Sequence, residues 1–416
     1  MLSTLGTFAN RLREVIYERS LSKRNRKLVW RVMDNFIFQT TGTIINETGF
    51  SDRLGDTIKG LGAQRLLLIT DPGIVSAGIA GKIKESLLKA GFEMTAFEKV
   101  EADPPEAVIL EAVTMAKETR VDCVIGLGGG SSLDTAKLVA FLAISQQSLD
   151  DIYGVGMAQG KRLPLILIPT TAGTGSEVTP IAIVTTRDNQ KMGVVSPLLV
   201  PDIALLDAEL TVGLPPHVTA ATGVDAMVHA IEAYTTINRK NPLSDMLAIK
   251  ALELLSKNIR RAVVDGRNLE SRSGMLLGSM LAGQAFANAP VAAVHALAYP
   301  LGGHFHVPHG LSNSLMLPHV MRFNAAVIPN QYAELAQIIL LETATGTAEE
   351  ISGCLIDWFE KLIAEIGLET KLSQVGIKED HLAMLAEDAV KQERLLVNNP
   401  RVVTYEDAFA IYKAAL

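Results

Sequence analysis

Cysteine is scarce in this chain, with only Cys123 and Cys354 among 416 residues. Two cysteines cannot form a disulfide framework. Such a low cysteine content is typical of proteins from a reducing compartment, and we therefore expect a cytoplasmic protein. Both cysteines have apolar neighbours in the sequence. We therefore expect both to be buried and to act as small hydrophobic residues.

A surplus of basic residues is also missing. The chain has 38 Lys and Arg against 45 Asp and Glu, which gives a formal net charge of −7. A nucleic-acid-binding protein more typically carries a basic surplus, so we set that class aside. Apolar residues make up 48% and charged residues 20%. That balance is typical of a globular protein and excludes a disordered, collagen-like or coiled-coil chain.

No long uninterrupted apolar run is present. The most apolar stretch, residues 163–184, is broken by prolines, glycines and Glu177, and a membrane helix needs about 20 apolar residues in a row. Residues 1–31 carry eight basic and two acidic residues without an apolar centre. The two acidic residues argue against a transit peptide, and the lack of an apolar central region argues against a signal peptide. We expect residues 1–32 to be an amphipathic surface extension of the mature protein.

The character of the sequence changes near Leu214-Pro215-Pro216. Before this point short apolar runs alternate with helical patterns, which predicts a parallel sheet covered by helices on both faces. After it helical patterns dominate, with no convincing strand. We therefore expect an α/β nucleotide-binding domain at 33–213 and an all-helical metal-binding domain at 214–416. The expected strands are 65–70, 123–127, 165–168, 181–185 and 203–206.

A glycine-rich turn lies at residues 123–137, CVIGLGGGSSLDTAK. A short apolar strand is followed by glycines and then by a helix that opens with Ser131 and Ser132. Glycines let the backbone approach a ligand closely, and a helix N-terminus offers free N–H groups, so this turn suits a pyrophosphate. The spacing departs from GxGxxG, and a tight strand–helix turn with a serine cap is the structural alternative.

Two other strand ends carry polar groups. Residues 169–179, PTTAGTGSEVT, bring five hydroxyl side chains together with two glycines, and they suit phosphate or ribose contacts as well as a plain polar loop. Asp71 ends the first expected strand. Its carboxylate would accept hydrogen bonds from the ribose hydroxyls of NAD and repel the 2′-phosphate of NADP. A structural role in an Asp-Pro-Gly turn explains an aspartate at this position equally well.

Histidines and one aspartate form a candidate metal site. Asp225 and His229 lie four residues apart and share one face of an expected helix. His295 and His309 bracket a second segment, HALAYPLGGHFHVPH, in which Gly303 and Pro308 are expected to shape a loop. One carboxylate and three imidazoles suffice for a divalent transition metal. Spacing leaves other histidines open as ligands, namely His304 and His306, and we expect structural roles for His217, His319 and His381.

These four motifs, in this order and spacing, resemble the iron-containing alcohol dehydrogenase family over residues 38–416. The resemblance implies a dehydroquinate synthase-like fold with NAD(P) and metal in a cleft between the two halves, and a homodimer. It implies four metal ligands, Asp225, His229, His295 and His309. It places the pyrophosphate on Gly128, Gly129, Gly130 and Ser131. It implies further cofactor contacts from Asp134 near the nicotinamide, from Thr170, Thr171, Thr174 and Lys191, and from Asp71, which favours NAD over NADP.

The sequence departs from the family pattern at two places. Many members have a second histidine four residues after the third ligand, proposed for proton transfer, and Tyr299 stands there. Tyr299, a water chain, His304 or His306 would have to replace it. The second departure is Asp103-Pro104, where the family often has Asn-Pro.

The resemblance implies an enzyme that transfers hydride between NAD(H) and a small primary alcohol or aldehyde, with Fe(II) or alternatively Zn(II). Residues 290–319 contain no Lys or Arg, which favours a neutral substrate over a phosphorylated or acidic one. A polyol-phosphate dehydrogenase, or a lyase of the dehydroquinate synthase type, stays open as the alternative. A nucleotide-binding scaffold with a structural metal is the non-enzymatic reading.

Overall fold

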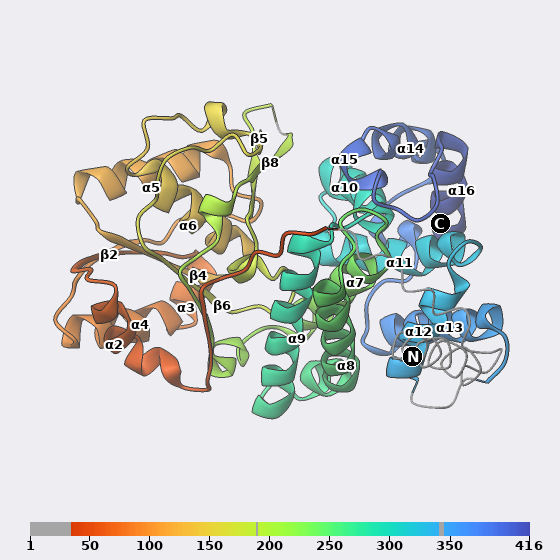
Figure 1. The fold of residues 1–416 in the computed structure, drawn as a ribbon, viewed down its shortest axis with the longest axis horizontal. Coiled ribbons are helices and arrows are strands. Elements are labelled where there is room, and N and C mark those ends of the chain that lie inside the picture. The colour runs from red at the N-terminus through yellow and green to blue at the C-terminus, as the bar shows by residue number, and fades with distance from the viewer. Residues whose placement is uncertain (1–34, 189, 341–344) are drawn as a thin grey trace, which may run out of the picture. The chain divides into compact units, whose positions relative to one another are not determined.

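The computed structural model describes residues 35–188, 190–340 and 345–416. The expected amphipathic extension, residues 1–32, lies outside the described residues. The chain divides into two units, Met1–Ile37 and Phe38–Leu416. All the helices and strands named below belong to the second unit, and Figure 1 labels many of them.

A six-stranded parallel sheet forms the first half of this unit, in the order β1-β9-β6-β4-β2-β3. Its strands are β1 (Thr43–Asn46), β2 (Arg65–Ile69), β3 (Glu93–Phe97), β4 (Cys123–Gly128), β6 (Leu165–Pro169) and β9 (Ile203–Leu206). The chain runs from β2 outward to β3 and then returns to place β4 on the other side of β2. The order therefore reverses between β2 and β4, which is where ligands bind in sheets of this kind.

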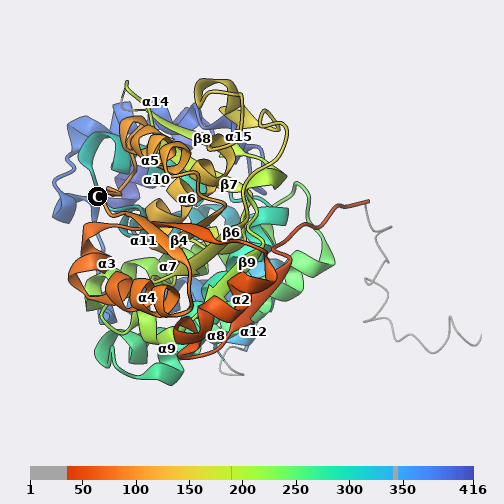
Figure 2. The same ribbon diagram turned by 90° about the vertical axis from the view of Figure 1, so that its left-hand side faces the viewer.

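Helices cover both faces of the sheet, as Figure 2 shows. Alternate residues of β2 point to opposite faces, so Leu66 and Leu68 pack with α2 (Leu54–Gly60) and α4 (Ile79–Lys89). Leu67 and Ile69 pack on the other face with α5 (Glu106–Glu118) and α6 (Gly130–Leu142). The predicted α/β architecture is confirmed, and the near-continuous apolar strands follow from burial on both faces.

One expected strand belongs to a different sheet. Residues 181–185 form β7 (Ile181–Thr185), which pairs antiparallel with β8 (Lys191–Val195). With β5 (Gly154–Val155) they make a separate three-stranded sheet. The strands β1 and β3 were not predicted, because β1 has only two apolar residues, β3 has a polar residue between its apolar ones, and both lie at an edge of the large sheet.

The second half is helical throughout its described residues, as predicted. Its long helices α7 (Pro216–Thr235), α8 (Pro242–Val264) and α9 (Leu269–Asn288) pack on one another. The remaining helices are α10 (Ala293–Phe305), α11 (His309–Ala325), α12 (Pro329–Ile339), α13 (Ala348–Glu365), α14 (Leu382–Val390), α15 (Glu393–Leu396) and α16 (Tyr405–Ala415). No described helix is long and apolar enough to cross a membrane.

A short helix, α3 (Pro72–Ser76), precedes α4, and Gly78 separates the two with a φ of 75°. Two local expectations were wrong. The loop expected between His295 and His309 is short, since α10 continues through Pro300 to Phe305. Cys123 is buried as expected, but Cys354 is exposed because it lies off the apolar face of α13.

The backbones of the two halves come close together at Gly175 and Gly283. Gly175, in the loop after β6, has a φ of 59°, and a Cβ on it would lie 2.5 Å from the Cα of Gly283 in α9. A Cβ on Gly283 would lie 2.8 Å from the Cα of Gly175. Both residues must be glycine for the loop to lie this close to α9, because neither backbone can move away as a flexible side chain would.

We predict that Gly283→Ala lowers the free energy of unfolding by about 1–3 kcal/mol, because the added methyl group forces this contact apart. Urea titration followed by circular dichroism measures the change. The matched control is Gly353→Ala in α13, where a Cβ meets nothing within 4 Å. The control should be neutral or stabilising by up to about 1 kcal/mol. Equal stability of the two variants would contradict the proposed contact.

Candidate active site

The helix α7 presents three charged or titratable side chains along one buried face. Asp225, His229 and Glu232 follow one another at four and three residues, so they lie above one another on the helix. Their exposed fractions are 2%, 5% and 3%. Groups this polar are buried only where partners satisfy them.

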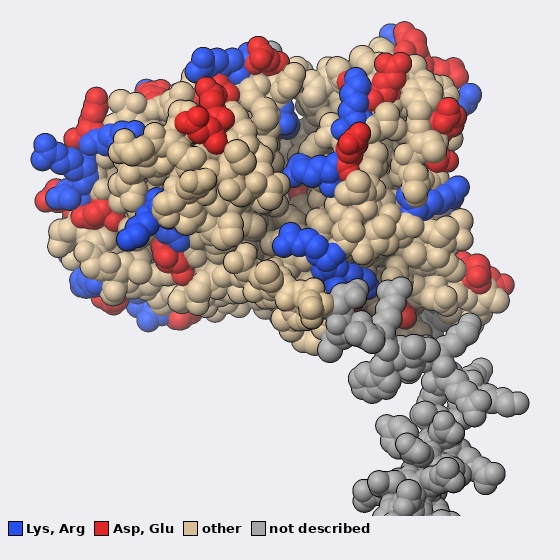
Figure 3. Space-filling model, turned by 45° about the horizontal axis from the view of Figure 1, so that its top comes forward, with Lys and Arg blue, Asp and Glu red and all other residues tan. Residues whose placement is uncertain are grey.

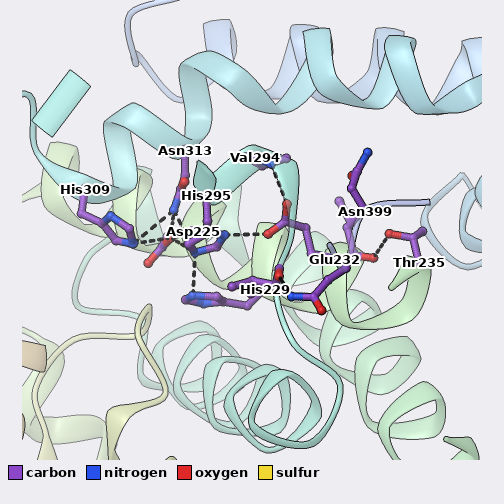
Figure 4. A network of polar contacts seen from close by, with 12 residues as sticks. Asp225, His229, Glu232, Thr235, Val294, His295, His309, Asn313 and Asn399 are labelled. Atoms are coloured by element: carbon purple, nitrogen blue, oxygen red, sulfur yellow. Dashed lines mark hydrogen bonds and ion pairs between the residues drawn. The ribbon is translucent and has the colours of Figure 1, made fainter. Parts of the chain in front are cut away.

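The next two helices complete the group. His295 lies near the start of α10, and His309 is the first residue of α11. Asp225, His229, His295 and His309 offer four ligand atoms that all lie within 4.8 Å of one another. Figure 4 shows the rings and the carboxylate pointing toward one another. The structure therefore brings together all four residues that the sequence analysis singled out for a metal.

The free ring nitrogens converge on one point. His229 donates its Nδ1 proton to the carbonyl of Gly173 at 3.2 Å, and His295 donates its own to Glu232 Oε2 at 2.6 Å. Each ring then turns its Nε2 inward, and the two Nε2 atoms are 3.1 Å apart. Two lone pairs at that distance repel each other in a water-poor interior unless a metal ion or a proton lies between them. This donor set fits a divalent transition metal.

Burial and neighbouring charges favour an ionised Asp225 and neutral rings at His229 and His309, whereas they favour a protonated ring at His295. Burial lowers the pKa of His229 to about 3 and also lowers that of His309. Burial alone would raise the pKa of Asp225, but the three imidazoles and Asn313 outweigh it and the pKa is lowered. Burial likewise opposes charge on His295, yet Glu232 reverses the direction and raises its pKa. An ionised carboxylate and neutral rings are the forms that bind a metal.

Two residues of this centre were missed by the sequence analysis. Glu232 accepts both the His295 ring proton and the Val294 backbone N–H, the latter at 2.7 Å. Asn313 Nδ2 lies 2.6 Å from Asp225 Oδ1 and 3.2 Å from the Nε2 atoms of His295 and His309. Helical spacing is the signal that points to both, since Glu232 follows His229 by three residues and Asn313 follows His309 by four.

The polar strand ends gather at the carboxyl edge of the parallel sheet. Asp71 follows β2, the glycines follow β4, and Thr170 follows β6. A Cβ on Gly128, whose φ is 145°, would lie 2.7 Å from Ser132 Oγ, and one on Gly130 would lie 2.9 Å from Thr174 Cγ2. The first turn of α6 has N–H groups without acceptors in the helix. A backbone cradle of this kind fits a pyrophosphate.

Some of the expected cofactor residues also have structural partners. Asp71 Oδ1 caps α3 by accepting from the Ile74 N–H at 3.1 Å, and its Oδ2 accepts from Ser132 Oγ at 3.1 Å. Asp134 accepts from Ser176 Oγ at 2.6 Å and from the Ile183 N–H at 2.9 Å.

Lys191 pairs with Asp103 at 2.7 Å. The two departures from the family pattern, Tyr299 and Asp103, both line one cavity with this lysine. Asp103 therefore already has a cationic partner within the structure, whereas an asparagine at this position would leave the lysine uncompensated.

One cavity of about 250 Å³ joins the start of α6 to the cluster of His229, His295 and His309. Figure 3 shows the surface hollowed between the two halves, with blue Lys and Arg side chains beside the hollow. The expected site residues that line the cavity are Gly130, Ser131, Asp134, Thr174, Lys191, His229, His295, Tyr299 and His309. Other expected site residues do not line it, namely Asp71, Gly128, Gly129, Thr170, Thr171 and Asp225.

The two histidines left open as ligands lie outside this cluster. His304 Nε2 contacts Asp388 Oδ2 at 2.6 Å near the surface. His306 is exposed and ends α10 with a φ of 53°. The continuation of α10 to Phe305 carries both away from the face that holds His295, which is why neither reaches the other ligands.

Comparison with known proteins identifies the family. The sequence matches the iron-containing alcohol dehydrogenase family over residues 41–208, and the C-terminal domain of that family over residues 219–416. The chain belongs to the iron-containing alcohol dehydrogenase family. It is accordingly an oxidoreductase of that family, and the fold and reaction class expected from its motifs are confirmed.

Several members of the family resemble the chain closely. Long-chain-alcohol dehydrogenase 1 of Geobacillus thermodenitrificans is 41% identical over 370 residues, which cover 88% of this chain and 93% of that protein. A crystal structure of 1,3-propanediol oxidoreductase has a TM-score of 0.89 at 32% identity and covers 92% of this chain and 100% of its own. Sulfoacetaldehyde reductase of Bifidobacterium kashiwanohense, solved with NAD+, has a TM-score of 0.83 at 28% identity, covering 92% and 98%.

We predict that Glu232→Gln weakens divalent metal binding by about 10- to 100-fold, because the amide cannot accept both the His295 and the Val294 protons. Competition with a fluorescent chelator measures the affinity. The matched control is Glu106→Gln, which alters a buried carboxylate that accepts from Tyr153 at 2.7 Å, outside the metal cluster. The control should lose stability but keep its metal affinity. Equal metal affinity in both variants would rule out the role given to Glu232.

Proposed function

We propose that this member of the family transfers hydride between NAD(H) and a small primary alcohol or aldehyde, with a divalent metal held by Asp225, His229, His295 and His309. The observation that carries the proposal is the cavity that these histidines share with Gly130 and Ser131 at the start of α6. A metal centre and a pyrophosphate cradle at two ends of one cavity are the two halves of a metal-dependent redox site.

The protein holds and orients the reactants. When bound, the metal supplies Lewis-acid polarisation of the alcohol oxygen, and the nicotinamide accepts the hydride. Glu232 and the Gly173 carbonyl fix the rings of His295 and His229, so the ligand geometry exists before substrate arrives. Both Fe(II) and Zn(II) accept three imidazoles and a carboxylate as ligands. We favour Fe(II) because the family to which the chain belongs is iron-containing, and Zn(II) is the alternative.

The nucleotide contacts proposed here come from the carboxyl edge of the sheet. The backbone at Gly128, Gly129, Gly130 and Ser131 would bind the pyrophosphate through its N–H groups. Asp134 would lie beside the nicotinamide. Other proposed contacts to the nucleotide are Thr170, Thr171, Thr174 and Lys191. The proximity of Asp71 to Gly128 supports a preference for NAD over NADP, because its carboxylate repels a 2′-phosphate.

Tyr299 is proposed to occupy the place of the usual second histidine. It lines the cavity, and its ring centroid is 6.1 Å from that of His309. Burial raises the pKa of Tyr299, so its hydroxyl stays protonated and acts as a hydrogen-bonding group at the reacting end of the substrate. We propose that proton transfer to solvent passes this hydroxyl rather than His304 or His306.

The remaining features of the proposal concern the protein as a whole. The change of character near residue 214 and the match of two family domains support the division at 33–213 and 214–416. The family resemblance supports a homodimer. The small number of cysteines supports a cytoplasmic location.

We predict that Asp225→Ala and His295→Ala lose bound metal and at least about 100-fold of turnover, because each removes one of four ligands. The protein is purified anaerobically, loaded with Fe(II) or Zn(II), and followed by NADH absorbance with short alcohols and aldehydes. His304→Ala is the matched control, since its ring contacts Asp388 instead. Full turnover of the ligand variants without metal would refute the proposal.

The same assay addresses the alternative chemistry. A lyase of the dehydroquinate synthase type would show no net change in NADH. One bound metal per chain with measurable NAD binding, but no NADH change with any alcohol or aldehyde, would favour that reading.

We further predict that Asp71→Asn raises the ratio of NADP to NAD efficiency by about tenfold, because it removes the repelling charge and keeps a capping side chain on α3. The ratio of kcat/KM values for the two cofactors reports the change. Asp122→Asn is the control, because Asp122 pairs with Arg65 at the opposite edge of the sheet. An unchanged ratio in Asp71→Asn would mean that Asp71 serves only as the helix cap.

A further inference from the structure

The cavity contains a cation that the sequence does not place there. Arg394 belongs to the short helix α15, almost a hundred residues beyond His295, and its side chain lines the same cavity as His229, His295 and Tyr299. The segment 290–319 indeed contains no Lys or Arg. The tertiary structure nonetheless brings a guanidinium to the metal end of the cavity.

Arg394 has few partners for its charge. Its guanidinium lies beside the side chain of Tyr299 and opposes the rise of the pKa of that hydroxyl. Among the ion pairs of the described residues, none involves Arg394, whereas Lys191, the other cation lining the cavity, is paired with Asp103 at 2.7 Å. A guanidinium has five N–H donors, so one neutral hydroxyl leaves most of them available. Arg394 is exposed, and a molecule in the cavity can therefore reach it.

The walls beside Arg394 have a different character. Phe286, Val291 and Leu395 line the cavity near the histidines, and Phe286 stacks on His229 with ring centroids 4.3 Å apart. The metal end of the cavity thus combines a centre for an oxygen ligand, an apolar wall and an unpaired guanidinium. This arrangement matches a molecule with a hydroxyl or carbonyl at one end, a short carbon chain, and an anion at the other.

We propose that Arg394 binds an anionic group of the substrate, so that the preferred substrate is a short primary alcohol or aldehyde bearing a carboxylate or sulfonate. Guanidinium recognises such groups through two parallel N–H···O bonds. This inference rests on the proposed dehydrogenase function and replaces the neutral substrate expected from residues 290–319. The reaction is unchanged: the alcohol gives up a hydride to NAD+ and a proton to solvent. Arg394 determines only which alcohol is bound.

The test compares substrates that differ in charge but hardly in shape. 4-Hydroxybutanoate and 4-methylpentan-1-ol differ by a carboxylate in place of an isopropyl group. The metal-loaded enzyme should prefer the acid. Arg394→Met should lower kcat/KM for the acid by about 10- to 100-fold, mainly through KM. It should change the neutral alcohol by less than about threefold, and Arg394→Lys should retain part of the preference.

The matched control is Lys391→Gln, which removes the same charge three residues earlier. Lys391 pairs with Asp388 and does not line the cavity. This control should keep the wild-type preference. A wild-type enzyme that prefers the neutral alcohol would overturn the proposal. An equal loss on both substrates in Arg394→Met would also overturn it, and would make Arg394 a positioning residue for Tyr299.

A binding measurement decides the matter even if neither alcohol turns over. Propane-1-sulfonate is a poor metal ligand, and methyl propyl sulfone is its neutral counterpart. Calorimetry on the enzyme loaded with metal and NAD+ should show that only the sulfonate binds, and that Arg394→Met weakens it by about tenfold or more. Absent or Arg394-independent sulfonate binding would refute the inference. NADH turnover of neutral alcohols in the same preparation would show that the dehydrogenase proposal survives.

Discussion

The inward convergence of imidazole nitrogens on the Asp225 carboxylate is the constraint around which the helical half is arranged. Such a cluster is unfavourable in a buried setting unless a cation joins its members. The structure meets this constraint by fixing the outer nitrogens of two rings, on Glu232 and on the Gly173 carbonyl. The four side chains come from three helices, α7, α10 and α11. These helices must therefore keep their relative positions for the side chains to stay in contact.

The nucleotide side depends on the same arrangement. Gly173 belongs to the threonine-rich loop of the α/β half, so the ring of His229 is oriented by a residue of the opposite half. The loop itself is secured by Lys137, which is fully buried and donates to Ser176, Thr179 and the Ile181 carbonyl. The proposed cofactor cradle and the proposed metal site are thus coupled through one loop, since the carbonyl of Gly173 contacts His229.

The charges of the cavity are unevenly distributed between its two ends. At the nucleotide end Lys191 and Asp103 compensate each other, and Asp134 is satisfied by Ser176 and the Ile183 N–H. At the metal end Arg394 has only the Tyr299 hydroxyl. If Arg394 binds an anionic group as proposed, this asymmetry would discriminate between substrates of equal size by their charge.

The sequence by itself determined much of the site. The resemblance to the family implies the four metal-site residues, and a helical spacing of four points to Asp225 and His229 independently. The α/β half follows from short apolar runs between helical patterns. These patterns are local: a helix places residues i and i+4 on one face, whatever surrounds it.

The tertiary structure decided the rest. It turned Glu232 and Asn313 toward the ligands, moved residues 181–185 into a separate sheet, left Cys354 at the surface, and brought Arg394 beside Tyr299. These outcomes depend on contacts between segments far apart in the chain, and periodicity within one segment carries no information about them. The charge of the cavity is likewise decided by the tertiary structure, because Arg394 lies far along the chain from the three histidines that line the same cavity.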